Sequence, residues 1–313
     1  MRFVRTTRMI DASEPQASGV RGEVTPPFNW AISGAVPYIY NYEVKNPKVT
    51  TELDGDFTAG FLKAANLAKD WFDKGYFNKD PFANKVRSKE AFEQGKSAVA
   101  FGNSIDTQGN IAKAIDSGFD VEIIPVLGST GHYPQDSFIN NGLAVAATSK
   151  NVDRTLQALD LMMEDPSYVY LIYYGIEGTN YVVKNGKIDL PEGVTADKNT
   201  YPIDQAGFWW VDKNLFKPLA SWPAAYITLQ SKIGAMLYAT PYAAFQFVPD
   251  NVKSELANVT QVWQQYEWPL QVGMVDDVNQ AISTLKDKLA AADSQKVQDE
   301  LQKQMDAFGA SLK

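Results

Sequence analysis

Cysteine is absent from the 313 residues, and histidine occurs only once, as His132. The absence of cysteine excludes disulfides, thiolate metal sites and cysteine nucleophiles. A single histidine excludes zinc sites that need several histidine ligands. Because His132 lies in the polar stretch Gly131–Pro134, we interpret it as a surface residue rather than a ligand or a base. The sequence therefore predicts no metal and no cofactor.

Basic residues are in deficit, with 29 Lys and Arg against 37 Asp and Glu and a net charge of −8. Because phosphate backbones are bound by basic surfaces, this balance argues against a nucleic-acid partner. No apolar run approaches the roughly 18 residues that a membrane span requires. Residues 1–11 contain three arginines but no apolar stretch of signal-peptide length, so we expect no signal peptide within this sequence.

Glycine-rich phosphate loops are also missing, since nothing matches GxxxxGK[ST] or GxGxxG, and neither HExxH nor GxSxG occurs. These absences remove most enzymes that can be recognised from a motif. A pair of carboxylates could still hydrolyse glycosidic bonds, and 37 acidic residues leave that alternative open. Hydrophobic residues at 45% and charged residues at 21% indicate a folded chain of one large or two ordinary domains.

Aromatic residues, by contrast, are abundant at 12% and cluster in the sequence. The early segment is rich in them, with Trp30 and then the run Tyr38–Tyr42. Trp209 and Trp210 are adjacent, so both cannot face one core and one of them should be partly exposed. Such a ring would stack on a sugar ring or pack inside the protein, and both interpretations stay open.

Strand and helix patterns alternate along the middle of the chain. Strands are expected at 97–101, 121–126 and 142–147, with helices at 56–75 (capped by Asp56), 106–116 and 152–164 (capped by Ser149). A hairpin at 181–190 should turn at Asn185-Gly186. From Pro223 the pattern is mainly helical, with an apolar stripe of Leu285, Leu289, Val297, Leu301, Met305 and Phe308. This order favours α/β layers.

The run EAFEQGKSAVAFG at Glu90–Gly102 resembles a hallmark of the family 1 extracellular solute-binding proteins, the maltose-binding-protein-like receptors of ABC importers. In that family a helix ends in "F..GK.AM...G" and is followed by a strand that points into the ligand cleft. The segments 121–126, 142–151 and 152–175 are similar to the following family segments. YGIEGTNY at Tyr174–Tyr181 and the helical C-terminal extension resemble a lipoprotein-type subgroup. The resemblance covers roughly residues 28–310.

This resemblance implies a periplasmic-binding-protein-like type II fold, with two α/β lobes, a hinge and a mainly helical C-terminal region. Residues 1–125 would form the second lobe, 126–200 part of the first lobe, and 201–313 the return to the second lobe with the helical extension. The family's N-terminal half-lobe has no counterpart in this sequence. We therefore expect an incomplete first lobe, completed by a longer product or by a second chain.

The function implied by the resemblance is reversible binding of an oligosaccharide-type carbohydrate in the cleft between the lobes, without catalysis. The partners would be the membrane subunits of an ABC importer. The full-length form would be exported and lipid-anchored at the extracellular face of the membrane. The alternatives are a carbohydrate-active hydrolase that uses an Asp/Glu pair and a non-binding fragment of a receptor.

Ligand-binding residues are expected where loops follow the carboxyl ends of strands, since open α/β sheets bind ligands there. Asn103 and Asp106 follow the expected strand at 97–101, and Asn140 precedes the one at 142–147. The family resemblance adds the aromatic residues of the cleft. The predicted ligand-binding residues are therefore Trp30, Asn103, Asp106, Asn140, Trp209 and Trp210.

Overall fold

The computed structural model describes residues 29–32, 36–77, 79–83, 85–100, 104–125, 127, 130–135, 143–201 and 212–312. The chain divides into two compact units. Unit 1 comprises residues 1–136 and 228–313, and unit 2 comprises residues 137–227. The lobe boundaries expected from the sequence stay a prediction.

A small antiparallel sheet lies in the core of unit 1. It contains β1 (Asn29–Trp30), β2 (Tyr38–Tyr40) and β3 (Thr50–Thr51) in that spatial order. Trp30 pairs with Ile39, and Ile39 pairs in turn with Thr50. All three residues of β2 are buried, because β2 is the central strand and packs among the helices.

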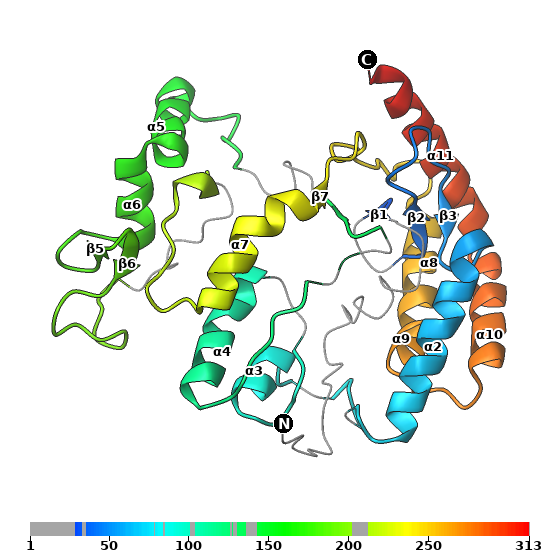
Figure 1. Cartoon of the computed structure of the whole chain (residues 1–313). Coiled ribbons are helices and arrows are strands. Elements are labelled where there is room, and N and C mark those ends of the chain that lie inside the picture. The colour runs from blue at the N-terminus through cyan, green and yellow to red at the C-terminus, as the bar shows by residue number, and fades with distance from the viewer. Residues whose placement is uncertain are drawn as a thin grey trace. The chain divides into compact units, whose positions relative to one another are not determined.

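Five helices of unit 1 pack with this sheet (Figure 1). They are α2 (Thr58–Asp73), α8 (Lys253–Tyr266), α9 (Trp268–Gln271), α10 (Val278–Ala291) and α11 (Ser294–Ser311). Helix α8 packs against both α10 and α11. The predicted stripe is confirmed, because Leu285, Leu289, Val297, Leu301 and Met305 are all buried in one core cluster.

Helix α11 approaches the rest of unit 1 closely at Gly309. A Cβ atom added at this position would collide with the hydroxyl oxygen of Tyr242. The Tyr242 ring lies 5.9 Å from the rings of both Tyr40 and Phe308, measured between centroids. The missing side chain at Gly309 therefore makes room for an aromatic side chain of the core.

Two further helices belong to unit 1, α3 (Ser88–Glu93) and α4 (Ser104–Asp116). They pack against each other, and the side-chain amide of Asn110 donates to Glu93 Oε2 at 2.6 Å. Short 3₁₀ turns lie at Gly55–Phe57 (η1) in unit 1 and at Lys213–Leu215 (η2) in unit 2.

Unit 2 contains α5 (Val152–Glu164), α6 (Pro166–Tyr174) and a hairpin of β5 (Val182–Lys184) and β6 (Lys187–Asp189). The predicted turn is confirmed, since Asn185 and Gly186 have φ of 51° and 75°, as a two-residue hairpin loop of this kind requires. Asp165 caps α6 by accepting from Ser167 N at 2.8 Å. Helix α7 (Ala224–Met236) spans the boundary between the two units.

Three expected strands are not strands in the described residues. Residues 97–100, 121–125 and 143–147 contain no strand, and a single bridge residue, Val99, is the nearest approach to one. A strand needs the backbone hydrogen bonds of a neighbour, and in these described stretches no neighbouring strand supplies them. Ile124 and Leu143 are accordingly 68% and 51% exposed.

Two expected helix caps were wrong, although the helices themselves are present. Asp56 lies inside the 3₁₀ turn, and Phe57 is the N-cap of α2. Asn151 is the N-cap of α5, and the hydroxyl of Ser149 instead accepts from Asn151 N at 3.3 Å. In each case the backbone begins to turn before or after the polar residue that the pattern favours.

Candidate functional site

A short parallel strand pair joins two distant parts of unit 1. Strand β4 (Tyr133–Pro134) pairs with β7 (Leu237–Tyr238), and Gln135 N donates to the Tyr238 carbonyl at 2.9 Å. The register places Tyr133 opposite Leu237. This pairing gathers aromatic side chains that are about a hundred positions apart in the sequence.

Three rings next to this pair form a small aromatic cluster, which we call the tyrosine site and define as Tyr42, His132 and Tyr238. The Tyr42 and Tyr238 ring centroids are 5.4 Å apart at an angle of 51°. The His132 and Tyr238 centroids are 6.3 Å apart. Tyr133 lies opposite Leu237, on the other face of the strand pair from Tyr238, and is 52% exposed. Flat rings with polar edges suit the apolar faces and hydroxyls of sugars.

The hydroxyl of Tyr42 is a hydrogen-bond donor in this site. It donates to the His132 carbonyl at 3.2 Å. Burial is the main cause that raises the pKa of Tyr42 above its ordinary value, and the nearby Glu43 carboxylate acts in the same direction. The group therefore stays protonated and uncharged at neutral pH, and it helps to hold the loop before β4.

The predicted ligand-binding residues lie mostly outside the described part of the chain. The backbone of Trp30 is in β1 and that of Asp106 is in α4, but the side chains of both are outside the described residues. The other four are wholly outside them: Asn103, Asn140, Trp209 and Trp210. Their roles in ligand binding stay predictions.

The residues on either side of Trp209 and Trp210 are anchored in unit 2. Tyr201 donates its hydroxyl to the Ile172 carbonyl of α6 at 2.7 Å. Asp212 donates its backbone N–H to the Met163 carbonyl of α5 at 3.1 Å. The segment that contains both tryptophans therefore begins and ends against the helix pair α5–α6.

A second aromatic cluster lies in unit 2 and is structural. Tyr174 is fully buried and contacts the rings of Tyr170, Tyr173 and Tyr181. Its hydroxyl donates to the Lys217 carbonyl and accepts from Lys217 N, both at 3.1 Å. This agrees with the packing face predicted for the tyrosines of 168–174, although Tyr168 itself is 43% exposed.

Neither metal binding nor membrane insertion is indicated by the described residues. Within them, His, Asp and Glu side chains do not gather in groups of three or more that could hold a metal ion. In the same part of the chain, no helix combines the length and the apolar character needed to cross a bilayer.

Comparison with known proteins matches residues 241–310, the helices α8–α11, to a domain of unknown function, DUF3502. Over 293 residues the chain is 22% identical to a carbohydrate ABC transporter substrate-binding protein of Streptococcus pneumoniae serotype 4 (strain ATCC BAA-334 / TIGR4), covering 90% of this chain and 56% of the relative. It is 32% identical over 169 residues to the polygalacturonan/rhamnogalacturonan-binding protein YtcQ of Bacillus subtilis (strain 168), covering 49% and 33%.

The crystal structure of the N-glycan transport solute binding protein NgtS from Streptococcus pneumoniae matches all of this chain. The TM-score is 0.70 at 21% identity, and 70% of the NgtS chain is covered. The chain has the fold of a solute-binding protein. The resemblance predicted from the sequence, to sugar-binding proteins of ABC importers, is thereby confirmed.

The match to NgtS covers the whole of this sequence, but the sequence does not extend over the whole of its relatives. It spans 56% of the first curated relative and 33% of the second. It also matches NgtS in complex with Man5GlcNAc, at a TM-score of 0.61.

In the sequence, the aromatic run Tyr38–Tyr42 is a signal for Tyr42, whereas no local pattern distinguishes Tyr238.

Proposed function

We propose that this chain is the carbohydrate-binding part of an ABC importer, which binds an oligosaccharide reversibly and does not change its covalent bonds. The observation that supports this most strongly is the match of the whole chain to a solved N-glycan transport protein, together with the names of its sequence relatives. The fold match alone would not specify a ligand. The aromatic surface beside β4 and β7 supports a sugar in particular.

The strand pair β4–β7 and the tyrosine site on one of its faces are the described part of the proposed binding surface. The exposed ring of Tyr133 would stack on the C–H face of a sugar, and Tyr238, on the other face of the pair, would anchor the pair to the core of unit 1. Trp30, Trp209 and Trp210 are proposed as further rings for the sugar, and Asn103, Asp106 and Asn140 as partners of its hydroxyls. Closure of two lobes about a hinge would then bury the ligand.

The importer's membrane subunits are the proposed protein partner, and the extracellular face of the membrane is the proposed location. Both follow from the kind of transport named for the relatives. Export and a lipid anchor would be properties of the full-length form. A polypeptide equivalent to the family's N-terminal half-lobe would complete the first lobe.

Three carboxyl groups of the described residues do not suit the hydrolase alternative. A general acid in a glycosidase needs a raised pKa. Asp165, Glu255 and Glu300 have pKa values below their ordinary range, because hydrogen bonds from Ser167, Lys296 and Gln304 respectively favour their charged forms. All three carboxylates lie at the surface, where their hydrogen bonds cap a helix or connect helices.

Isothermal titration calorimetry against an oligosaccharide panel tests the proposal. The panel includes Man5GlcNAc, oligogalacturonides and rhamnogalacturonan fragments, since the relatives are named for such sugars. We expect binding to at least one sugar and an affinity about tenfold lower in Tyr133→Ala, since a stacked ring contributes about 1 kcal/mol or more. Tyr76→Ala is the matched control, because Tyr76 is 40% exposed after α2 and belongs to no such surface. A folded protein that binds no sugar of the panel would contradict the proposal.

A further inference from the structure

Helix α11 carries polar side chains on both sides of its buried apolar stripe. Val297, Leu301 and Met305 form the stripe. At 100° per residue, Gln302 falls on one side of it and Gln304 on the other. The long amide side chains at these two positions can reach the backbone of the chain segments that lie beside α11.

On the first side, glutamines of α11 bind the extended segment that precedes β3. Gln302 Oε1 accepts from Val49 N at 2.6 Å, and Gln302 Nε2 donates to the Pro47 carbonyl at 3.3 Å. Gln298 Nε2 donates to the Val49 carbonyl at 2.9 Å. The backbone of Val49 thus has both of its polar groups bound by side-chain amides of one helix.

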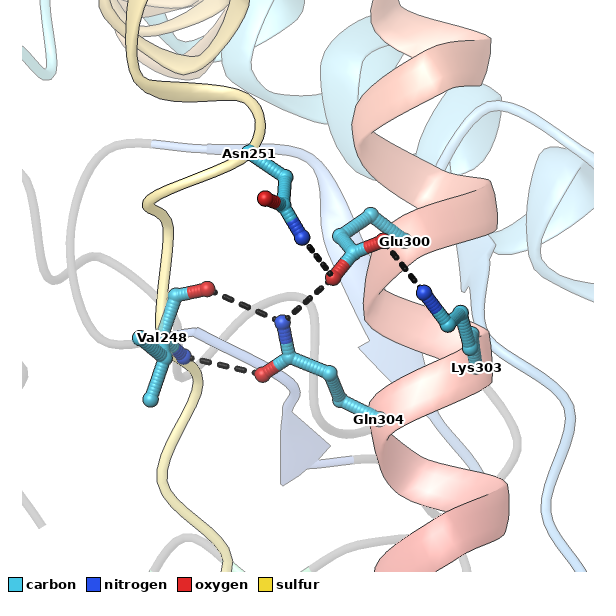
Figure 2. Close-up of polar contacts among 5 residues, drawn as sticks. All are labelled: Val248, Asn251, Glu300, Lys303 and Gln304. Atoms are coloured by element: carbon cyan, nitrogen blue, oxygen red, sulfur yellow. Dashed lines mark hydrogen bonds and ion pairs between the residues drawn. The ribbon is translucent and has the colours of Figure 1, made fainter.

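On the second side, Gln304 binds the segment between β7 and α8 in the same way (Figure 2). Its Oε1 accepts from Val248 N at 3.0 Å, and its Nε2 donates to the Val248 carbonyl at 2.9 Å. Glu300 Oε1 accepts from Gln304 Nε2 at 2.8 Å and from Asn251 Nδ2 at 3.0 Å, which fixes the orientation of the amide. Lys303 lies 3.5 Å from the other carboxylate oxygen.

These two segments also carry the facing rings of the tyrosine site. Residues 38–49 lead from β2 through Tyr42 to Val49, and residues 237–248 lead from Tyr238 to Val248. Val49 is buried, whereas Val248 is 54% exposed. A buried backbone amide requires a partner, and for Val49 that partner is an amide side chain of α11, which takes the place of a neighbouring strand. Both segments are therefore held against one rigid helix.

We propose that Gln302 and Gln304 are positioning residues that set the spacing of the Tyr42 and Tyr238 rings. The inference rests on the proposed function in so far as the rings bind a sugar, and it assigns a role to α11, which lies within the match to the domain of unknown function. The helix acts as a clamp on the two segments. It contacts neither the rings of Tyr42 and Tyr238 nor a ligand through these amides.

The first test measures backbone hydrogen exchange in Gln302→Leu and Gln304→Leu. Loss of one amide acceptor should speed exchange about fivefold at Val49 in the first variant and at Val248 in the second. Each effect should be confined to its own segment. Gln295→Leu is the matched control, because exposed Gln295 lies on the same helix and its amide donates to the Asp299 side chain. Unchanged exchange at Val49 and Val248 would overturn the clamp.

A milder variant separates the clamp from a general loss of folding. Gln302→Glu keeps an acceptor for Val49 N but loses the donor to the Pro47 carbonyl and to Asp306 Oδ1. Exchange at Val49 should therefore stay near the wild-type rate in Gln302→Glu and rise in Gln302→Leu. Equal acceleration in both variants would mean that the helix as a whole has loosened, and it would contradict the inference.

The positioning role is tested by the tyrosine ring resonances of isotope-labelled protein, assigned with Tyr42→Phe and Tyr238→Phe. Gln302→Leu and Gln304→Leu should shift the signals of Tyr42 and Tyr238, whereas Gln295→Leu should leave them in place. Faster exchange without a shift of either ring would mean a purely structural role and would overturn the inference. These readouts need no ligand, so a wild-type protein that binds no sugar overturns the proposed function alone. With a sugar that binds, an unchanged affinity in both leucine variants would also overturn the positioning role.

Discussion

Unit 1 and unit 2 contain helices of similar amphipathic pattern but bury them very differently. In unit 1, α10 and α11 contribute Leu285, Leu289 and Leu301 to a large continuous core. In unit 2, α5 contributes no buried residue, and the local core cluster consists of Tyr174, Tyr181 and Ile188 with a few partly buried neighbours. An apolar stripe on a helix therefore predicts which face needs a partner, but not that the partner is present.

Several apolar side chains of unit 2 are exposed to solvent. Leu156 of α5 is 52% exposed, Leu171 of α6 is 52% exposed, and Ile176 just beyond α6 is 58% exposed. Single exposed apolar residues are common, but several on one pair of helices are typical of an interaction surface. This agrees with the proposal that another polypeptide segment completes the first lobe.

The largest effect that distinguishes the units is expected from truncation of a core leucine. Leu301→Ala in α11 should lower the free energy of unfolding by about 3–4 kcal/mol, because Leu301 is fully buried and the cavity cannot collapse. Leu156→Ala in α5 should cost less than about 0.5 kcal/mol, as for an exposed side chain. Urea denaturation measures both, and equal costs would break the comparison.

A second contrast concerns glycines in the left-handed region. Gly273 has φ of 72°, and an added Cβ would collide with the Ala68 carbonyl group of α2, so Gly273→Ala should cost about 2–3 kcal/mol. Gly193 in unit 2 has φ of 76° with open space around it, so Gly193→Ala should cost about 1 kcal/mol from backbone strain alone. Thermal unfolding of the two variants tests this difference. Equal costs would show that the packing around Gly273 adjusts.

A smaller effect on stability, but a clear one on association, is expected for the apolar face of unit 2. The double variant Leu156→Glu/Leu171→Glu should bind less of a hydrophobic dye and associate less in sedimentation, with a change in unfolding free energy within about 0.5 kcal/mol. Val44→Glu is the control, since Val44 is an exposed apolar residue of unit 1, at 45%. Unchanged dye binding in the double variant would show that the face is already covered.

The smallest expected effect is on the pH dependence of the stability of unit 1. The pKa of Glu300 lies below its ordinary value because Gln304 and Asn251 donate to the carboxylate. A lowered folded-state pKa means that this stabilisation is fully present above the unfolded-state pKa and is lost as the pH falls through the folded-state value. Glu300→Gln should therefore lower the urea midpoint at pH 7 slightly, and this difference should shrink as the pH falls below the unfolded-state pKa. A difference that does not shrink as the pH is lowered would point to packing instead of charge.

Local patterns in the sequence predicted local structure well. The Asn185-Gly186 turn and the stripe from Leu285 to Met305 depend on neighbours within a few residues, and both are present. The strands at 97–101, 121–126 and 142–147 failed because a strand depends on a distant partner. The tyrosine site was missed for the same reason, since β4–β7 pairing brings Tyr238 beside His132, and the Tyr42 hydroxyl donates to the His132 carbonyl. The six predicted ligand residues stay predictions.

The missing side chain at Gly309 restricts how α11 can pack against the rest of unit 1. A glycine within a helix costs about 1 kcal/mol relative to alanine, yet here it is the residue whose missing side chain admits the Tyr242 hydroxyl. A slide of the helix by one position would bring the side chain of Phe308 or Ala310 against that hydroxyl. The close contact between the Tyr242 hydroxyl and Gly309 thus fixes the position of α11 along its own axis.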